Sequence, residues 1–339
     1  MDFDGYKEVP IYNSDGTVAY YQLEITWKEN TMKEDSLKAI RKFTGIDNIE
    51  TIGLDDTFGF KCQQCGKCCM NRRDIILNPF DVYNGAKYLG ITPLEFLEKY
   101  CFTDLGGYSK IPMVLLATND NGFCPLLKFD IKDGGKFKCT IHPAKPGACA
   151  NHPIGVAYST SLSDNHQETT YVKVDQCSNS VSDEQQLVRE WIKSYLDNQA
   201  EIDIAHEIQS LAAKYFDPRK FWLLLSFLAK MSETLENKSE KVSELGKEVI
   251  AMAAAKYLSS SIALGYTSYD INRPFIEQAK ENMEKLDKFY TETKAIYETM
   301  KDAFKAITGK SFEEEYDDFE KHLKEQEGDA TDGNDSKCD

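Results

Sequence analysis

Residues 61–69, the thiol loop, read Lys61-Cys62-Gln63-Gln64-Cys65-Gly66-Lys67-Cys68-Cys69. The loop places four thiols within eight residues. A buried cysteine acts as a small hydrophobe, and a hydrophobic core has no need of four on one polar turn. The Gln, Gly and Lys residues between the thiols predict a loop, and Gly66 allows the backbone angles of a tight turn. We therefore interpret this segment as a metal-binding loop around which the N-terminal half of the chain is organised.

The spacing of the thiols favours one class of metal centre. Cys62, Cys65 and Cys68 recur at every third residue, as in bacterial ferredoxins, where such a run supplies three thiolates to an iron–sulfur cluster. Zinc ribbons usually carry two separated C-x2-C pairs instead. The pattern therefore favours an iron–sulfur cluster, of the 4Fe-4S type, over zinc, and zinc stays open as the alternative. The remaining ligand must come from elsewhere in the chain.

A second group of cysteines, which follows the thiol loop in the sequence, can supply this remaining ligand. The candidate ligands of the two groups together suffice for one or two metal centres. Because neighbouring side chains of an extended backbone point to opposite sides, we expect Cys68 and Cys69 to serve two different centres, or one of them to bind a metal and the other to support it from outside the coordination sphere. His142 and His152 flank the second group, and we expect them outside the first coordination sphere. Cys101 and Cys338 lie outside any chelating turn. The candidate metal ligands are Cys62, Cys65, Cys68, Cys69, Cys124, Cys139, Cys149 and Cys177.

Over roughly residues 57–180, about a third of the chain, the sequence resembles the YkgJ-like cysteine-cluster family, with its zinc- or iron-chelating CxxCxxCC domain. The resemblance rests on the run from Phe60 to Cys69, on Cys124-Pro125, and on residues 139–153. The family includes flagellin lysine methylases. It therefore implies either a metal-binding protein or an S-adenosylmethionine-dependent protein lysine N-methylase. Where the family usually has Tyr, Arg and Arg around the last motif, this chain has His142, Lys145 and Ala150.

Charge and composition argue against several other classes of protein. A net charge of −16 argues against a general nucleic-acid binder, which needs a basic face. We expect no secretory signal and no membrane span, because the N-terminus is acidic and polar and the longest apolar run, residues 221–229, is far too short. We expect a cytoplasmic protein, in which thiols stay reduced and clustered cysteines bind metal. Lys61, Lys67, Arg72 and Arg73 flank the thiols and would favour thiolates.

The order of sequence signals predicts an α+β protein, in which a small irregular cysteine-rich metal-binding domain with short helices and strands precedes an all-α helical region. Residues 7–28 predict a hairpin around Asp15-Gly16, and residues 36–43 a short helix. Asn78-Pro79 and Thr92-Pro93 predict the starts of two helices, and residues 111–180 predict short strands and turns. The expected domains are 1–56 (hairpin and short helix), 57–180 (metal-binding), 181–327 (helical) and 328–339 (a disordered acidic tail).

The helical region carries a capping box at Ser182 and Gln185, a helix start at Asp217-Pro218, and a heptad-like apolar seam over residues 274–307. This seam packs on neighbouring helices or forms a homodimer, and a protein partner could bind there. Purely structural zinc in an interaction module is a third reading. Whether the protein is an enzyme stays open. It has no G-x-G-x-x-G loop and lacks the C-x3-C-x2-C spacing of radical S-adenosylmethionine enzymes.

Overall fold

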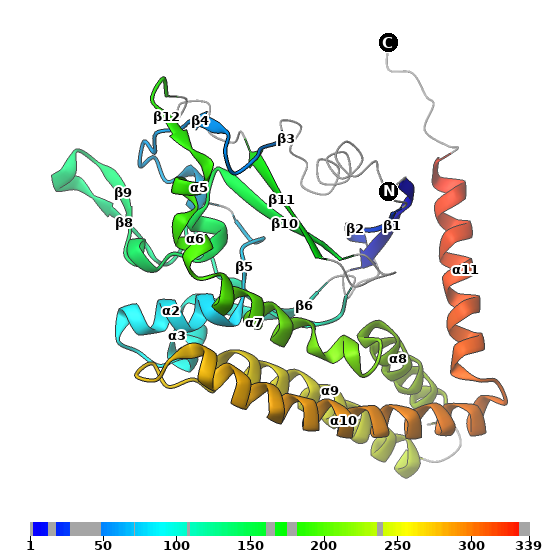
Figure 1. Cartoon of the computed structure of the whole chain (residues 1–339). Coiled ribbons are helices and arrows are strands. Elements are labelled where there is room, and N and C mark those ends of the chain that lie inside the picture. Colours follow the sequence, from blue (N-terminus) through cyan, green and yellow to red (C-terminus); the bar gives the residue numbers. More distant parts are fainter. Residues whose placement is uncertain are drawn as a thin grey trace. The chain divides into compact units, whose positions relative to one another are not determined.

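The structure is a computed structural model that describes residues 3–12, 18–27, 49–70, 72–106, 109–160, 167–174, 182–235 and 240–331. The helix expected over residues 36–43 lies outside the described residues, and so do Cys177 and Cys338. The α+β class is confirmed, because short antiparallel strands dominate the first half and helices the second (Figure 1).

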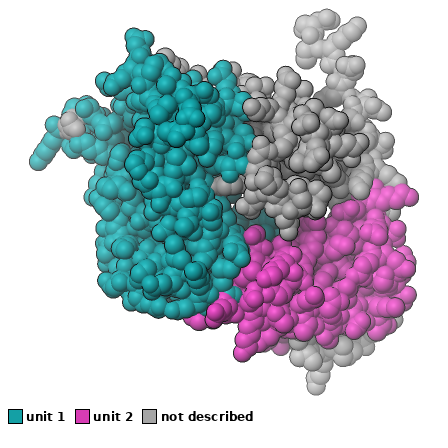
Figure 2. Space-filling view, viewed as in Figure 1, with its two compact units in different colours: residues 1–209, 262–283 teal, residues 210–261, 284–339 magenta. Residues whose placement is uncertain are grey.

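The chain forms two compact units (Figure 2). Unit 1 comprises Met1–Gln209 and Ile262–Met283, and unit 2 comprises Ser210–Ser261 and Glu284–Asp339. Unit 1 therefore contains the cysteine-rich segment together with two parts of the expected helical region. The helix-rich sequence after residue 181 does not form one unit of its own.

The strands of unit 1 pair in small antiparallel sheets. The predicted N-terminal hairpin is confirmed, with Lys7 opposite Glu24. The other hairpins pair neighbouring strands, whereas β5 joins β7, β3 joins β11 and β4 joins β12 across longer stretches of sequence. The sheets are β1 (Phe3–Tyr12) with β2 (Val18–Trp27); β10 (Ile154–Thr160), β11 (Gln167–Val174) and β3 (Ile49–Thr51); β12 (Gln185–Leu187) with β4 (Thr57–Gly59); β5 (Ile76–Leu77), β7 (Pro112–Leu116) and β6 (Cys101–Leu105); and β8 (Leu127–Asp130) with β9 (Lys136–Cys139).

Two helices follow the thiol loop, and both predicted starts are confirmed. Helix α2 (Pro79–Leu89) begins with a reciprocal capping box between Asn78 and Asp81 and ends at Gly90 in the left-handed conformation. Helix α3 (Pro93–Tyr100) begins with the same box between Thr92 and Glu95. Each box satisfies backbone N–H groups that the first helical turn leaves without partners.

These helices cover a core beneath the cysteine-rich segment. Its buried members include Leu77, Val82, Phe96 and Ile141, all with no exposed surface. Tyr266 also belongs to this core, and it comes from the π-helix η6 (Ala263–Thr267). The core is therefore built partly from a segment more than a hundred residues away in sequence.

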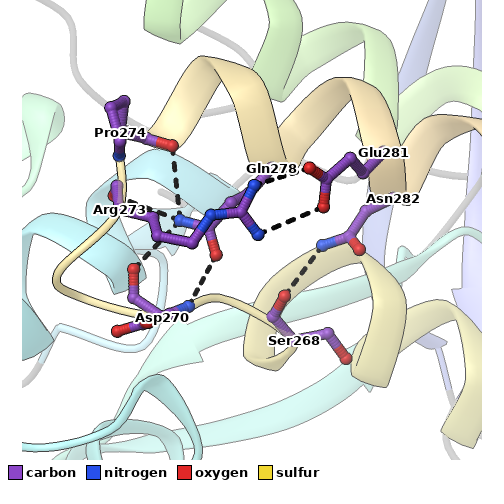
Figure 3. A network of polar contacts seen from close by, with 7 residues as sticks. All are labelled: Ser268, Asp270, Arg273, Pro274, Gln278, Glu281 and Asn282. Carbon is purple, nitrogen blue, oxygen red and sulfur yellow. Dashed lines mark hydrogen bonds and ion pairs between the residues drawn. The ribbon is translucent and has the colours of Figure 1, made fainter.

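A polar network holds that distant segment in place (Figure 3). The buried Gln278 donates to the carbonyl oxygens of Asp270 and Arg273 at 2.9 and 3.1 Å and accepts the Asp270 N–H at 2.7 Å. The buried Asn282 donates to the Ser268 carbonyl at 3.0 Å. The Tyr83 hydroxyl of α2 donates to the Arg273 carbonyl at 2.7 Å, which connects the network to the helices below the thiols.

The capping box expected at Ser182 and Gln185 is wrong. Residues 185–187 form β12, which pairs with β4, and the first helix starts only at Val188. Gly59 makes this pairing possible, since a Cβ there would lie 1.9 Å from the Ser182 carbonyl oxygen. The Gln186 side chain donates to the Phe60 carbonyl at 3.0 Å, so the strand holds the entry to the thiol loop.

Unit 2 is built mainly from long helices, of which α10 begins in unit 1. The predicted helix start at Asp217-Pro218 is confirmed, and the apolar seam lies on α10 with Leu286, Tyr290, Tyr297 and Phe304 buried. The helices that follow β12 in the two units are α5 (Val188–Trp191), α6 (Lys193–Asp197), α7 (Gln199–Ser210), η5 (Leu211–Lys214), α8 (Pro218–Leu235), α9 (Glu240–Ile262), α10 (Phe275–Thr308) and α11 (Phe312–Thr331).

Helix α11 extends into the range expected to be a disordered tail. It ends at Thr331, so residues 328–331 are helical, and residues 332–339 lie outside the described part. Ser311 and Glu314 cap its start with reciprocal hydrogen bonds of 2.8 and 3.2 Å. Among the helices that the structure describes, none is long and apolar enough to cross a membrane.

Candidate metal centre

The thiol loop follows β4 and has no regular structure until it forms one 3-10 turn, η1 (Lys67–Cys69). Gly66 precedes the turn with φ of 75°, and its carbonyl accepts the Cys69 N–H at 2.8 Å. A Cβ on Gly66 would lie 2.9 Å from Met70 Cε and 3.0 Å from the Phe137 ring. The position thus requires glycine both for its dihedral angle and for the close approach of its neighbours.

The loop is attached to the hairpin formed by β8 and β9. The Phe137 N–H of β9 donates to the Gln64 carbonyl at 2.9 Å. Within the loop, Cys62, Cys65 and Cys68 are exposed and Cys69 is half-buried. The three thiols of the triplet are therefore reachable from solvent.

The structure brings the second cysteine group to the end of the thiol loop. The Cys124 N–H donates to the Cys69 carbonyl at 2.9 Å, beside a bridge between Met70 and Phe123. Cys139 ends β9, and Cys149 lies in the short helix α4 (Gly147–Ala150) after the 3-10 turn η3 (His142–Ala144). Cys124, Cys139 and Cys149 all pack against the core beneath them.

The expected divergence of Cys68 and Cys69 is wrong. The two residues lie in a 3-10 turn rather than an extended strand, and their sulfur atoms are 3.8 Å apart. The alternation of side chains that separates neighbours holds only for extended backbone. The geometric reason for assigning these thiols to different centres is therefore lost.

Five thiols lie close enough to shift one another's pKa. The hydrogen bond with Cys69 lowers the pKa of Cys68, and the same bond, burial and the charges of Cys149 and Cys124 raise the pKa of Cys69. Burial raises the pKa of Cys124 and of Cys139, and raises that of Cys149 to about 12. These five residues form one electrostatic neighbourhood, which we call the thiol cluster.

Two cations act on the thiol cluster. Lys145 opposes the rise in pKa that burial causes at Cys139 and Cys149, and it lowers the pKa of Cys68 after the larger effect of Cys69. Arg72 also acts on Cys68, and it is held by Asp74 through hydrogen bonds of 2.6 and 2.8 Å. Arg72 was expected to lie near the thiols, but the position of Lys145 was not. Its signal in the sequence is its place four residues before Cys149, between Pro143 and Pro146.

The two histidines lie beside the same cations. Burial and Lys145 lower the pKa of the exposed His142. Burial, Arg72 and Lys145 lower the pKa of His152, whose ring packs edge-on against Phe60 with centroids 5.8 Å apart. Both imidazoles are thus favoured in their neutral form, and neither makes a described contact with a thiol.

Cys101 lies at the start of β6 rather than on the thiol loop. Burial raises its pKa to about 12, with a smaller contribution from Cys124. This thiol is therefore a core residue next to the cluster.

No group of three or more Cys, His, Asp or Glu side chains within the described residues is arranged so as to hold a metal ion. The donor chemistry of the thiol cluster nonetheless fits a thiophilic metal. The cluster combines five thiols, four of them half-buried, with two cations, Arg72 and Lys145, that act on Cys68. Soft thiolate ligands select zinc and iron–sulfur centres over hard cations.

These features define a cysteine-rich segment whose thiols gather at one place. Residues 61–178 match the CxxCxxCC family model, described as a "putative zinc- or iron-chelating domain". The match covers about a third of the chain and confirms the resemblance to the cysteine-cluster family. No match to the chain was found among curated proteins or among solved structures.

Proposed function

We propose that the thiol cluster binds one metal centre, with Cys68, Cys69, Cys124, Cys139 and Cys149 as its candidate ligands. The hydrogen bond between the Cys124 N–H and the Cys69 carbonyl carries this proposal, because it joins the two cysteine groups at one place. The short distance between the sulfur atoms of Cys68 and Cys69 supports one shared centre rather than two.

Other thiols remain available to complete the site. Cys62 and Cys65 lie on the exposed part of the same loop, a few residues from Cys68. Cys177 stays a predicted ligand. The loop is fastened at Gln64 and at Cys69, so a local change in backbone conformation around Cys62 and Cys65 can bring their exposed thiols to a metal.

We further propose that the metal is iron, in an iron–sulfur cluster. Support comes from the triplet spacing of Cys62, Cys65 and Cys68 and from the charges of Arg72 and Lys145, since a thiolate-ligated cluster is anionic. Such a cluster supplies one-electron transfer. The protein would contribute the thiolates, the cations that favour their ionisation, and the core that limits access of water from below.

Anaerobic purification tests this proposal. We expect a brown protein with iron, acid-labile sulfide and a broad visible absorption band. A colourless protein that holds stoichiometric zinc, from cells supplied with ample iron, would replace iron–sulfur by zinc. A protein that binds neither metal would refute the metal centre itself.

Methyl transfer to protein lysines, a protein partner of the helical region and a homodimer stay predictions. For methyl transfer, calorimetry with S-adenosylmethionine on the anaerobically reconstituted protein is the direct test. Absence of binding would leave the metal-binding function as the working conclusion.

A further inference from the structure

The carboxylate of Asp81 connects helix α2 to the segment that carries Cys149. Its Oδ2 accepts the Asn78 N–H at 3.0 Å, as part of the capping box. Its Oδ1 accepts the Gly147 N–H at 2.9 Å, from a residue 66 positions along the chain. One side chain thus binds two backbone groups from separate parts of unit 1.

Gly147 begins the turn on which Cys149 lies. The turn is closed by the Cys149 N–H bonding to the Pro146 carbonyl at 2.8 Å and by the Asn151 N–H bonding to the Gly147 carbonyl at 3.0 Å. Pro146, at the N-cap of α4, makes no side-chain cap. Asp81 therefore supplies from another element the acceptor that the local sequence does not.

Asp81 is itself on a rigid support. Pro79 starts α2, and Val82 and Ala86 on the next turns have no exposed surface. Because Asp81 is fixed on α2, its hydrogen bond to Gly147 also fixes the start of α4 relative to α2. The charge of Asp81 also acts on Cys149, which agrees with their closeness.

We infer that Asp81 is a positioning residue for the metal centre: its bond to Gly147 holds the turn of residues 146–150 so that Cys149 lies beside Cys124 and Cys139. The inference rests on the proposed metal-binding function. It requires Asp81 to act through the backbone of Gly147 rather than by touching the metal.

Helix α3 offers a matched control. Glu95 forms the same capping box there, accepting the Thr92 N–H at 2.8 Å, and it lies on the other helix of the pair. Glu95→Ala and Asp81→Ala each remove the third residue of a capping box. They differ in that only Asp81→Ala also removes the acceptor of Gly147. Asp81→Asn keeps an amide oxygen that can accept the Gly147 N–H, but its NH2 group can no longer accept the Asn78 N–H, and the charge is lost.

The experiment uses the full chain in these three variants. In reduced, metal-free protein, the alkylation rate of Cys149 by N-ethylmaleimide is measured relative to Cys101 by mass spectrometry. Bound iron and sulfide are measured separately after anaerobic reconstitution. For Asp81→Ala we expect the Cys149-to-Cys101 ratio to rise severalfold and the metal content to fall, because local opening of the turn exposes Cys149. Glu95→Ala should change neither, and Asp81→Asn should lie closer to wild type than Asp81→Ala does.

Equal effects of Asp81→Ala and Glu95→Ala would overturn the inference, and so would equal increases in the alkylation of Cys149 and Cys101. Either result would mean that Asp81 only stabilises the fold. A wild-type protein without metal would refute the proposed function separately. The alkylation ratio would still decide whether Asp81 orders Cys149.

Discussion

Gly66 shows how much of the site depends on single residues. Its φ of 75° is a conformation in which an L-residue loses about 1–2 kcal/mol. The neighbours Met70 and Phe137 leave no space for a side chain. The sequence indicated the turn but not the second requirement, since Phe137 is seventy-one residues away.

We expect Gly66→Ala to destabilise unit 1 by about 2–4 kcal/mol, the sum of the dihedral cost and the cost of overpacking. Gly90→Ala is the control. Gly90 has φ of 67°, and a Cβ added there would meet nothing within 4 Å, so we expect only the dihedral cost, about 1 kcal/mol. Urea denaturation of the reduced, metal-free proteins measures both. Equal losses would show that the contacts with Met70 and Phe137 yield without cost.

The ionisation of the thiol cluster predicts a pH dependence of metal binding. Because burial raises the pKa of Cys124, Cys139 and Cys149, these thiols are protonated at neutral pH and must release protons to bind metal. The affinity should therefore rise with pH, about tenfold per pH unit for each proton displaced. Competition with a chelator for zinc measures this affinity. A pH range of about 6.5 to 8.5 is suitable, because it lies at and below the ordinary thiol pKa of about 8.5. An affinity independent of pH would mean that the thiols are already ionised.

At the scale of elements, local signals were reliable where one segment contains its own partners. The capping boxes of α2 and α3 and the start of α8 at Pro218 follow from adjacent residues. The box at Ser182 failed because β4, more than a hundred residues away, offers the same backbone a strand partner. Cys68 and Cys69 were misjudged because the sequence does not tell a 3-10 turn from an extended loop.

The polar network of Figure 3 allows the stability contribution of a buried side chain to be compared with that of an exposed one on the same helix. Gln278 is 4% exposed and bonds the backbone at Asp270 and Arg273, so Gln278→Ala removes three part-buried hydrogen bonds and the packing of a buried side chain. We expect a loss of about 2–4 kcal/mol. Glu281 pairs with Arg273 at the surface, and we expect Glu281→Ala to lose less than about 1 kcal/mol. Urea denaturation of the two variants compares them, and a larger loss for Glu281→Ala would contradict this ranking.

At the scale of the whole molecule, composition and motif order predicted the α+β class and the cysteine-rich segment. They did not predict that residues 262–283 belong to unit 1, because Tyr266 packs in the core beneath the thiols and Tyr83 bonds the Arg273 carbonyl, both across long sequence separations. The donor set was accessible from the sequence, since cysteine spacing is local. The arrangement of Lys145 and Asp81 around it was not, since each acts through a fold that brings distant turns together.

The number of centres can be decided by removing single thiols. If one centre uses the thiol cluster, Cys69→Ser should lower the metal content to well below half of wild type, because the Cys69 sulfur lies 3.8 Å from that of Cys68 and the Cys69 carbonyl accepts the Cys124 N–H. Cys101→Ser should keep the full metal content, since Cys101 starts β6 and lies outside both the thiol loop and the second cysteine group. Metal analysis after anaerobic purification distinguishes these outcomes. A stable protein with half the metal in Cys69→Ser would restore the scheme of two centres.

Metal removal should loosen unit 1 locally rather than unfold it. A core of fully buried residues lies beneath the thiols, including Leu77, Val82 and Phe96. Apolar burial of this kind does not depend on a metal. After chelation under reducing conditions, we expect faster amide exchange in residues 61–70 and 137–151, with protection retained in α2 and α3 and throughout unit 2. Loss of protection in α2 and α3 together with the loops would mean that the metal organises the core as well.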